Sequence, residues 1–239
     1  MEADILILPG YCVKPISLIS TDLKGAGMKT FDKITTVLVM GSIWGAFEIF
    51  GAIGLTRLGV PHRSPFLFAF ALATLLAAKR MGGFPGSALV MAALASVYKT
   101  LSLDLHACGA VSVMAVLIDG AVFEITYGIA RTSIESSPLR RSLLGPAITV
   151  AAYVPFAFYA TYAGGEAING IAGFRGITAF LTTSAPWAAL LSIPAINAGF
   201  YAGEALKGLR PAGAGLSGRY AQAFGILIVA AAWIARFSI

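Results

Sequence analysis

Charged residues, histidines and cysteines are all scarce in this sequence. Only 12% of its 239 residues are charged, whereas 58% are hydrophobic, and the chain has two histidines and two cysteines. The mean hydropathy of +0.83 lies far above that of a water-soluble domain of this length. Two cysteines are too few for a disulfide framework. The composition therefore excludes a small disulfide-stapled domain and indicates the lipid bilayer as the surrounding medium.

The sequence also lacks the short motifs of common enzyme classes. It contains no H-E-x-x-H, no G-x-S-x-G, no P-loop and no paired C-x-x-C. We therefore predict no catalytic residues, no cofactor and no ATPase activity of its own. The formal net charge is +6, but the basic residues cluster near the ends of apolar segments and do not form a patch interleaved with aromatic residues. We expect no nucleic-acid partner.

Apolar segments recur along the chain with the length of membrane-spanning helices. Short stretches rich in Lys, Arg, Gly and Pro separate them, which is the spacing of a helical bundle and not of a β-barrel. The predicted fold is an all-α polytopic transmembrane bundle of six or seven helices, forming one membrane domain over residues 28–239. The expected spans cover roughly residues 34–55, 65–78, 87–103, 107–130, 143–162 and 173–206, with a seventh apolar run at 220–237.

Prolines interrupt two of the expected spans. Pro146 and Pro155 fall in the fifth span, and Pro186 and Pro194 fall in the sixth, which is too long for one straight crossing. Proline removes a helical hydrogen bond and bends the helix. The sequence therefore predicts kinks or a re-entrant break in the sixth span.

Basic residues are distributed unevenly between the two predicted sides of the membrane. With seven crossings and a cytoplasmic amino terminus, twelve of the 17 Lys and Arg residues fall on the cytoplasmic side. This asymmetry follows the positive-inside rule and predicts a cytoplasmic amino terminus. Residues 1–27 precede Met28 and lack the pattern of a cleavable signal. We interpret them as a disordered tail or a mis-called extension.

Four ionisable residues fall within the predicted spans, namely Glu48, Lys99, Asp119 and Glu124. Such a residue is costly in the membrane unless it faces a cavity or a partner. Helical rise places Glu48 and Lys99 at similar heights in the outer half, where they could pair. Asp119 and Glu124 point about 140° apart around one helix, so at most one of them joins that site. The alternative is that these groups are structural ion pairs or reach the interface.

Two predicted outer loops carry side chains that could bind a ligand. The first loop has His62 and Arg63, and the second has Asp104, His106 and Cys108 at alternate positions. The D-x-H-x-C spacing resembles a metal-ligand pattern, and with His62 it could hold a transition metal. Ordinary loop polarity explains the same residues, so we predict no metal and keep this site as the alternative.

The first span carries a ridge of small residues. Gly41 and Gly45 lie one helical turn apart, and such a pair lets another helix approach closely. The approaching helix could belong to the same bundle or to a separate membrane subunit. The sequence leaves both alternatives open.

Four segments in the first half carry a family resemblance. They are GSIWGAFE at 41–48, GVP at 59–61, the stretch 86–99, and DGAVFE at 119–124. Over roughly residues 33–128 the chain resembles the S components of energy-coupling factor (ECF) vitamin transporters. The resemblance implies a six-helix binding subunit without an ATPase of its own. Such a subunit binds its substrate near the outer face and docks on a separate transmembrane coupling subunit, which recruits two ATPases.

Under this resemblance, Gly41 and Gly45 would be the docking ridge and the outer pocket would surround Glu48. The implied function is uptake of a vitamin-like or other small nutrient across a prokaryotic cell membrane. The predicted substrate-binding residues are Trp44, Glu48, His62, Lys99, His106 and Asp119. The seventh apolar run departs from the family pattern. An autonomous proton- or ion-coupled carrier, a small intramembrane lipid-modifying enzyme and a structural subunit remain alternatives.

Overall fold

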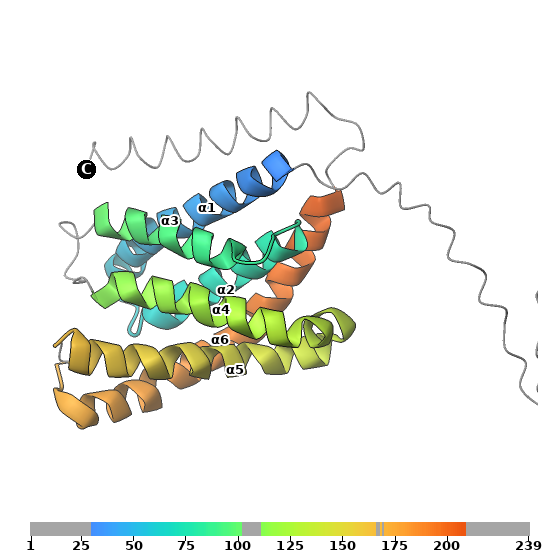
Figure 1. Ribbon diagram of the computed structural model, residues 1–239. Coiled ribbons are helices and arrows are strands. Elements are labelled where there is room, and N and C mark those ends of the chain that lie inside the picture. Colours follow the sequence, from blue (N-terminus) through green and yellow to red (C-terminus); the bar gives the residue numbers. More distant parts are fainter. Residues whose placement is uncertain (1–29, 102–110, 166–167, 169, 209–239) are drawn as a thin grey trace, which may run out of the picture.

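The computed structural model describes residues 30–101, 111–165, 168 and 170–208 (Figure 1). These residues are almost entirely helical, and the extended structure among them is limited to one isolated bridge between Ile168 and Ile171. The all-α prediction is confirmed. The described helices are α1 (Thr30–Arg57), α2 (Ser64–Arg80), α3 (Ser87–Leu101), α4 (Val111–Ser136), α5 (Pro138–Phe158) with its π-helical extension η2 (Tyr159–Ala163), and α6 (Gly173–Gly208).

Proline and glycine set several of the helix boundaries. Proline occupies the first turn of α2 and of α5, where its missing N–H group would have had no helical partner. Gly82 has φ +114°, a conformation that favours glycine, and it ends the α2 segment. The adjacent Gly83 N–H donates to the Ala78 carbonyl at 3.0 Å, which closes the turn. The chain then reverses and enters α3.

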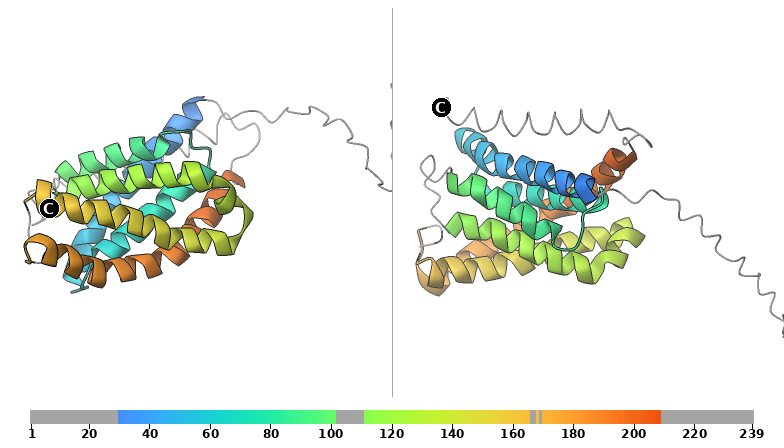
Figure 2. Two further views of the ribbon diagram at one scale, coloured as in Figure 1. Left: turned by 60° about the horizontal axis from the view of Figure 1, so that its bottom comes forward. Right: turned by 45° about the horizontal axis from the view of Figure 1, so that its top comes forward.

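The six α-helices of the described chain close into a ring. In the order around the ring they are α1, α2, α6, α5, α4 and α3, and each packs against the next, with α3 returning to α1 (Figure 2). Helix α2 also contacts α3 and α4, so it lies toward the interior. We call the end with residues 58–63, between α1 and α2, the His62 end. The opposite end, where the described chain begins and finishes, is the terminal end (Figure 1).

The hydrophobic core follows α2 along the bundle. Leu72, Leu75 and Leu76 on α2 are buried, and Phe123 of α4 and Ile196 of α6 pack into the same cluster. Burial of such side chains contributes about 1.5–3 kcal/mol each. The core therefore joins helices that are distant in the sequence into one domain.

Close backbone contact between α2 and α6 depends on glycine. A Cβ atom placed on Gly199 would lie 2.8 Å from the Ala73 Cα atom, and one on Gly203 would lie 2.8 Å from the Ala77 carbonyl oxygen. Neither position has room for a larger residue without a shift of the α2 backbone. This pair of glycines, four residues apart, lets α6 lie directly on α2.

Among the described residues, four helices are long and apolar enough to cross a membrane, by length and composition. They are Asp32–Arg57, Val111–Ser136, Pro138–Ala163 and Gly173–Lys207, and Ser87–Thr100 is a shorter apolar helix. Large apolar side chains face outward, including Ile129, Leu143 and Leu190, as expected for contact with lipid. Membrane embedding is therefore supported. The exact number of spans stays a prediction, because residues 220–237 lie outside the described residues, as do residues 1–27.

The sequence predicts kinks or a re-entrant break in the sixth span, and of these two alternatives the re-entrant break is wrong. Helix α6 runs without interruption through Pro186 and Pro194 from Gly173 to Gly208, about 54 Å by helical rise. Both prolines are exposed, so the interrupted hydrogen bonds do not fall in the core. The neighbouring helices α2 and α5 pack along α6 and hold it together. Because 54 Å exceeds a hydrocarbon core of about 30 Å, α6 must tilt, bend or project beyond it.

Candidate functional site

A buried ion pair joins α1 to α3 near the His62 end. The Lys99 Nζ atom donates to Glu48 Oε2 at 2.9 Å and to the Glu48 main-chain carbonyl at 3.3 Å. The Trp44 indole N–H donates to the other carboxylate oxygen, Glu48 Oε1, at 3.2 Å. Glu48 and Lys99 are only 5% and 7% exposed, and Trp44 is fully buried. The pairing predicted from helical rise is confirmed.

Two glycines of α1 bring this pair together. A Cβ atom on Gly41 would lie 3.1 Å from the Met91 Cα atom of α3, and one on Gly45 would lie 2.8 Å from the Tyr98 ring. Helix α3 of the same chain therefore already occupies the face of α1 that carries the glycines. This favours internal packing over docking to another subunit, the two alternatives that the sequence left open.

Asp119 of α4 lies close to the same pair. It interacts electrostatically with Glu48 and Lys99, and protein atoms enclose it, although its side chain keeps some accessible surface. No hydrogen bond to its carboxylate is found among the described residues. The next residue, Gly120, packs against Ala92 and Ala88 of α3 and so lets α4 approach closely. An ionised carboxylate is an acceptor only, so Asp119 offers an acceptor that the described protein groups leave unused.

Tyr153 of α5 adds a second unused polar group. Its hydroxyl group is buried and has no hydrogen-bond partner, although it lies close enough to Asp119 and Glu48 to interact electrostatically. The Ser64 side chain is nearby but outside hydrogen-bonding geometry. The ring is fixed by stacking on Phe180, with centroids 5.2 Å apart, and by an edge contact with Phe68. A buried hydroxyl group without a partner costs about 1–3 kcal/mol.

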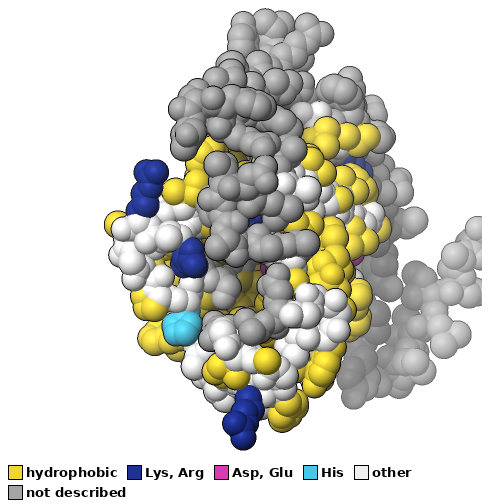
Figure 3. Space-filling view, turned by 90° about the vertical axis from the view of Figure 1, so that its left-hand side faces the viewer, with side chains coloured by type: hydrophobic (Ala, Val, Ile, Leu, Met, Phe, Trp, Pro, Cys, Tyr) yellow, Lys and Arg dark blue, Asp and Glu magenta, His cyan; other side chains and the backbone are white. Residues whose placement is uncertain are grey.

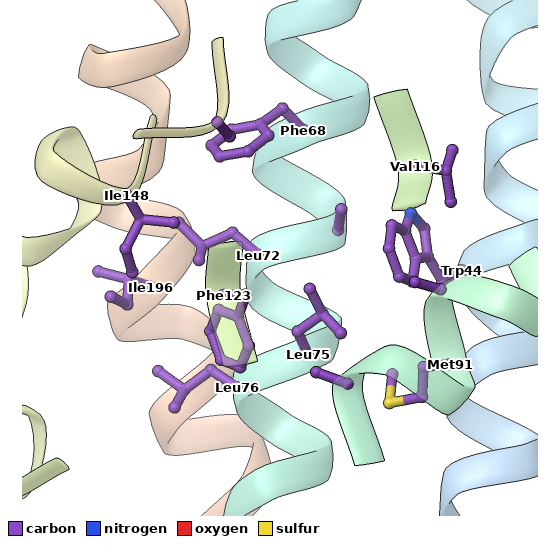
Figure 4. Packing of buried hydrophobic residues seen from close by; sticks show 14 of the residues in the cluster. Trp44, Phe68, Leu72, Leu75, Leu76, Met91, Val116, Phe123, Ile148 and Ile196 are labelled. Carbon is purple, nitrogen blue, oxygen red and sulfur yellow. The ribbon is translucent and has the colours of Figure 1, made fainter. Parts of the chain in front are cut away.

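We call Glu48, Lys99, Asp119 and Tyr153 the polar cluster. By helical rise, Glu48 lies about 13 Å from the Arg57 end of α1. Seen from the His62 end, basic side chains and a histidine stand around the end face, and small areas of basic and acidic side chain are visible further in (Figure 3). Deeper in the bundle the core is apolar, with Trp44 and Val116 on one side of α2 and Phe123 and Ile148 on the other (Figure 4).

Comparisons of the sequence with protein-family models and curated proteins, and of the fold with solved structures, find no match. The arrangement of the polar cluster must therefore carry the functional argument. The cluster contains two carboxyl groups and one ammonium group, with one hydroxyl group beside them. It can bind a solute through charge and hydrogen bonds, and no residue in it is paired as a nucleophile with its base.

Of the predicted loop ligands His62, Asp104, His106 and Cys108, the structure describes only His62, which is not part of the polar cluster. His62 is exposed, and its Nδ1 atom lies 3.3 Å from the Ser184 hydroxyl of α6. No hydrogen bond or ion pair joins it to the cluster. Among the described residues, no group of three His, Cys, Asp or Glu residues is placed to hold a metal ion. Asp104, His106 and Cys108 lie outside the described residues, so the metal hypothesis is untested.

Glu124 belongs to a separate structural contact. It accepts hydrogen bonds from Lys79 Nζ at 2.8 Å, from the Gly86 N–H at 2.8 Å and from the Ala88 N–H at 3.0 Å. Lys79 also donates to the Phe84 carbonyl at 2.9 Å. The carboxylate thus ties the turn between α2 and α3 to α4. The prediction that Asp119 and Glu124 do not share one site is confirmed.

Arginines close the terminal end of the bundle. Arg80 pairs with Glu135 at 2.9 Å and with Glu204. Arg141 is 2% exposed, donates to the Asn197 side chain at 2.9 Å and lies 3.6 Å from the centre of the Phe200 ring. In the sequence, both arginines count only among the basic residues that predict the cytoplasmic side of the membrane. The polar Asn197 and Glu204 in the sixth predicted span were the available hint that α6 receives them.

Proposed function

We propose that the protein is the substrate-binding membrane subunit of an ECF-type uptake transporter for a vitamin-like or other small nutrient. The observation that carries this proposal is a polar cluster inside an apolar helical bundle in which two groups find no hydrogen-bond partner among the residues that the structure describes. A purely structural ion pair needs only Glu48 and Lys99. The unused Asp119 carboxylate and Tyr153 hydroxyl group are better explained by a solute that supplies their hydrogen bonds.

The two ends of the bundle differ in what fills them, and this difference supports a binding subunit over a continuous channel. Toward the terminal end, the apolar core and the contacts of Arg80, Glu124 and Arg141 fill the bundle. The polar cluster lies nearer the His62 end, which is the outer face in the predicted topology. A solute would therefore enter from outside and stop at the cluster. Its release to the cytoplasm would require a partner that moves or opens the bundle, the role of the proposed coupling subunit and ATPases.

The Glu48→Gln substitution tests the proposal. The amide keeps the shape of the side chain but loses its charge-assisted hydrogen bonds. We expect the affinity for the solute that co-purifies with the wild type to fall about ten- to hundredfold, since such a contact contributes about 1.5–3 kcal/mol. Calorimetry on the purified proteins measures the affinity, and thermal unfolding is recorded in parallel.

Glu135→Gln at the terminal end is the matched control, because Glu135 is a partly exposed ion-pair partner far from the cluster. Unchanged affinity in Glu48→Gln together with a large fall in melting temperature would reduce Glu48 to a structural role. Co-purification of ATPase subunits with the tagged wild type tests the transporter assignment separately.

An autonomous proton-coupled carrier is the second candidate, and Asp119 is the observation that favours it. An enclosed carboxyl group without a hydrogen-bond partner can exchange a proton with a transported solute. Such a carrier would transport the solute in liposomes containing this chain alone, driven by an imposed proton gradient. A binding subunit would bind the solute there but would not accumulate it.

A further inference from the structure

A proline inside α6 weakens the helix at one point. Pro194 has no N–H group to donate to the Leu190 carbonyl one turn earlier, and its ring crowds that oxygen. The nearby Ser192 hydroxyl donates to the Ala189 carbonyl at 2.7 Å, a side-chain bond within the helix of the kind that favours bending. The helix therefore bends more easily at Pro194 than in a stretch with a complete hydrogen-bond ladder.

The part of α6 that precedes Pro194 is fixed by close packing. Gly145 of α5 lies so near that a Cβ atom on it would be 2.8 Å from the Ser192 carbonyl oxygen. The Phe180 ring stacks on Tyr153 of α5, with centroids 5.2 Å apart, and Ser192 is fully buried. This part of the helix cannot move without disrupting the packed interior.

The part that follows Pro194, residues 195–208, is held differently and ends at the terminal end (Figure 1). Ile196 is the one large apolar side chain of this described segment that is buried. Its closest contacts with α2 are made at Gly199 and Gly203, which carry no side chain to interlock with that helix. Moving this segment therefore sacrifices less apolar packing than moving the rest of α6.

Two arginines fasten this segment at the terminal end. The Arg80 Nε atom of α2 donates to Glu204 Oε1 at 2.7 Å. The Arg141 Nε atom of α5 donates to Asn197 Oδ1 at 2.9 Å. The two guanidinium groups also lie 4.6 and 3.6 Å from the centre of the Phe200 ring. The Arg80 and Glu204 side chains are 18% and 38% exposed, so water competes for their ion pair and the contact can open and re-form.

We propose that residues 195–208 form a gate at the terminal end, hinged at Pro194 and held shut by Arg80 and Arg141. The contacts that open are polar or involve a single ring, while the packed part of α6 stays in place. The role of the gate as an exit to the cytoplasm rests on the proposed function. In that function a solute bound nearer the His62 end must leave through the opposite end of the bundle.

Distances between two spin labels measure the motion of the gate. We call Ser136→Cys with Ala205→Cys the gate pair, and Ser136→Cys with Leu190→Cys the reference pair; all three positions are exposed. The two native cysteines are replaced, and the full-length protein is measured in lipid nanodiscs by pulsed electron paramagnetic resonance. A turn of about 20° at Pro194 moves residue 205, about 17 Å further along the helix, by about 6 Å.

Releasing either arginine should open the gate. Glu204→Ala removes the carboxylate that Arg80 binds, and Asn197→Ala removes the oxygen that Arg141 binds. In each variant we expect a second distance population for the gate pair, shifted by about 6 Å, and an unchanged distance for the reference pair. Glu204 is partly exposed, so Glu204→Ala keeps the test valid if Asn197→Ala does not fold.

Replacing the proline tests the hinge itself. Pro194→Ala in the Glu204→Ala background supplies the missing N–H group and should remove the second population. A merely structural ion pair would not give this reversal. Pro186→Ala is the matched control, because Pro186 is also an exposed proline inside α6, and it should leave the second population in place.

The outcomes separate the gate from the proposed function. An unchanged gate-pair distance in Glu204→Ala, equal shifts of both label pairs, or a second population that persists after Pro194→Ala would each overturn the gate. None of these measurements involves a solute. If the gate moves as expected but no solute and no ATPase subunit co-purifies with the wild type, the hinge stands and the proposed function fails.

Discussion

Neutralising Lys99 alone should destabilise the protein more than neutralising both members of the buried pair. Lys99→Met leaves the Glu48 carboxylate 5% exposed, with the Trp44 indole as its remaining described donor. Stranding one charge of a buried pair costs about 3–5 kcal/mol. In this variant the carboxylate can escape the cost of a stranded charge by taking up a proton. Because protonating an ordinary glutamate at pH 7 costs about 4 kcal/mol, the loss of stability cannot exceed about that value. We therefore expect a loss of about 3–4 kcal/mol.

The double variant Glu48→Gln/Lys99→Met should recover most of that loss. It removes both charges while the glutamine oxygen can still accept the Trp44 hydrogen bond, and replacing a buried pair by neutral groups of similar size is often close to neutral. Reversible unfolding of the wild type, both single variants and the double variant in mixed micelles gives the coupling free energy. We expect about 2–4 kcal/mol.

The Arg131–Glu135 pair of α4 is the matched control for this cycle. Its side chains are 68% and 36% exposed, and its members lie four residues apart on one helix. Such a pair should couple by no more than about 0.5 kcal/mol. If the Glu48 and Lys99 substitutions prove additive within about 0.5 kcal/mol, the buried pair contributes no more than the exposed one, and the reasoning from burial is refuted.

Three further predictions follow from the packing and the topology. Gly45→Ala should destabilise the protein by about 1–3 kcal/mol in the same unfolding assay, because its Cβ atom would overlap the Tyr98 ring. Gly54→Ala in the same helix has open space and should be neutral or stabilising by up to about 1 kcal/mol, so equal losses would contradict the close contact. Glu124→Gln should loosen the turn between α2 and α3 and speed amide hydrogen exchange at its N–H donors, whereas unchanged exchange would remove its clamping role. With the two native cysteines replaced, an impermeant thiol reagent should label Leu58→Cys and spare Ser136→Cys in intact cells; the reverse pattern would invert the proposed orientation.

Helical geometry made part of the candidate site predictable. The rise per residue put Glu48 and Lys99 at one height, and the rotation per residue separated Asp119 from Glu124. Both inferences need only the length and direction of each helix, which apolar segment boundaries supply. The ion pair between Glu48 and Lys99 agrees with the first inference, and the separate ion pair between Glu124 and Lys79 agrees with the second.

Which face of each helix points inward could not be predicted in the same way. In a membrane bundle, lipid and protein interior are both apolar, so hydrophobic periodicity carries little information about direction. On α4, Ile129 is 82% exposed and Phe123 is 1% exposed, although both are large and apolar. The partner of Gly45 and the role of Tyr153 depend on these directions. They became visible only with the packing of the helices.

The ring order of the helices has a consequence for synthesis of the chain. Helix α2 packs most extensively on α6, which is made more than 100 residues later, and the Arg80 ion pair with Glu204 waits for the same helix. Until the ribosome has delivered α6, the small residues Ala73 and Ala77 have no glycine partner to cover them. Glu48 and Lys99 lie on α1 and α3, whereas the Tyr153 ring of α5 stacks on Phe180 of α6. Pairing of Glu48 with Lys99 can therefore precede closure of the ring, and insertion of α6 then fixes the Tyr153 ring and closes the ring of described helices.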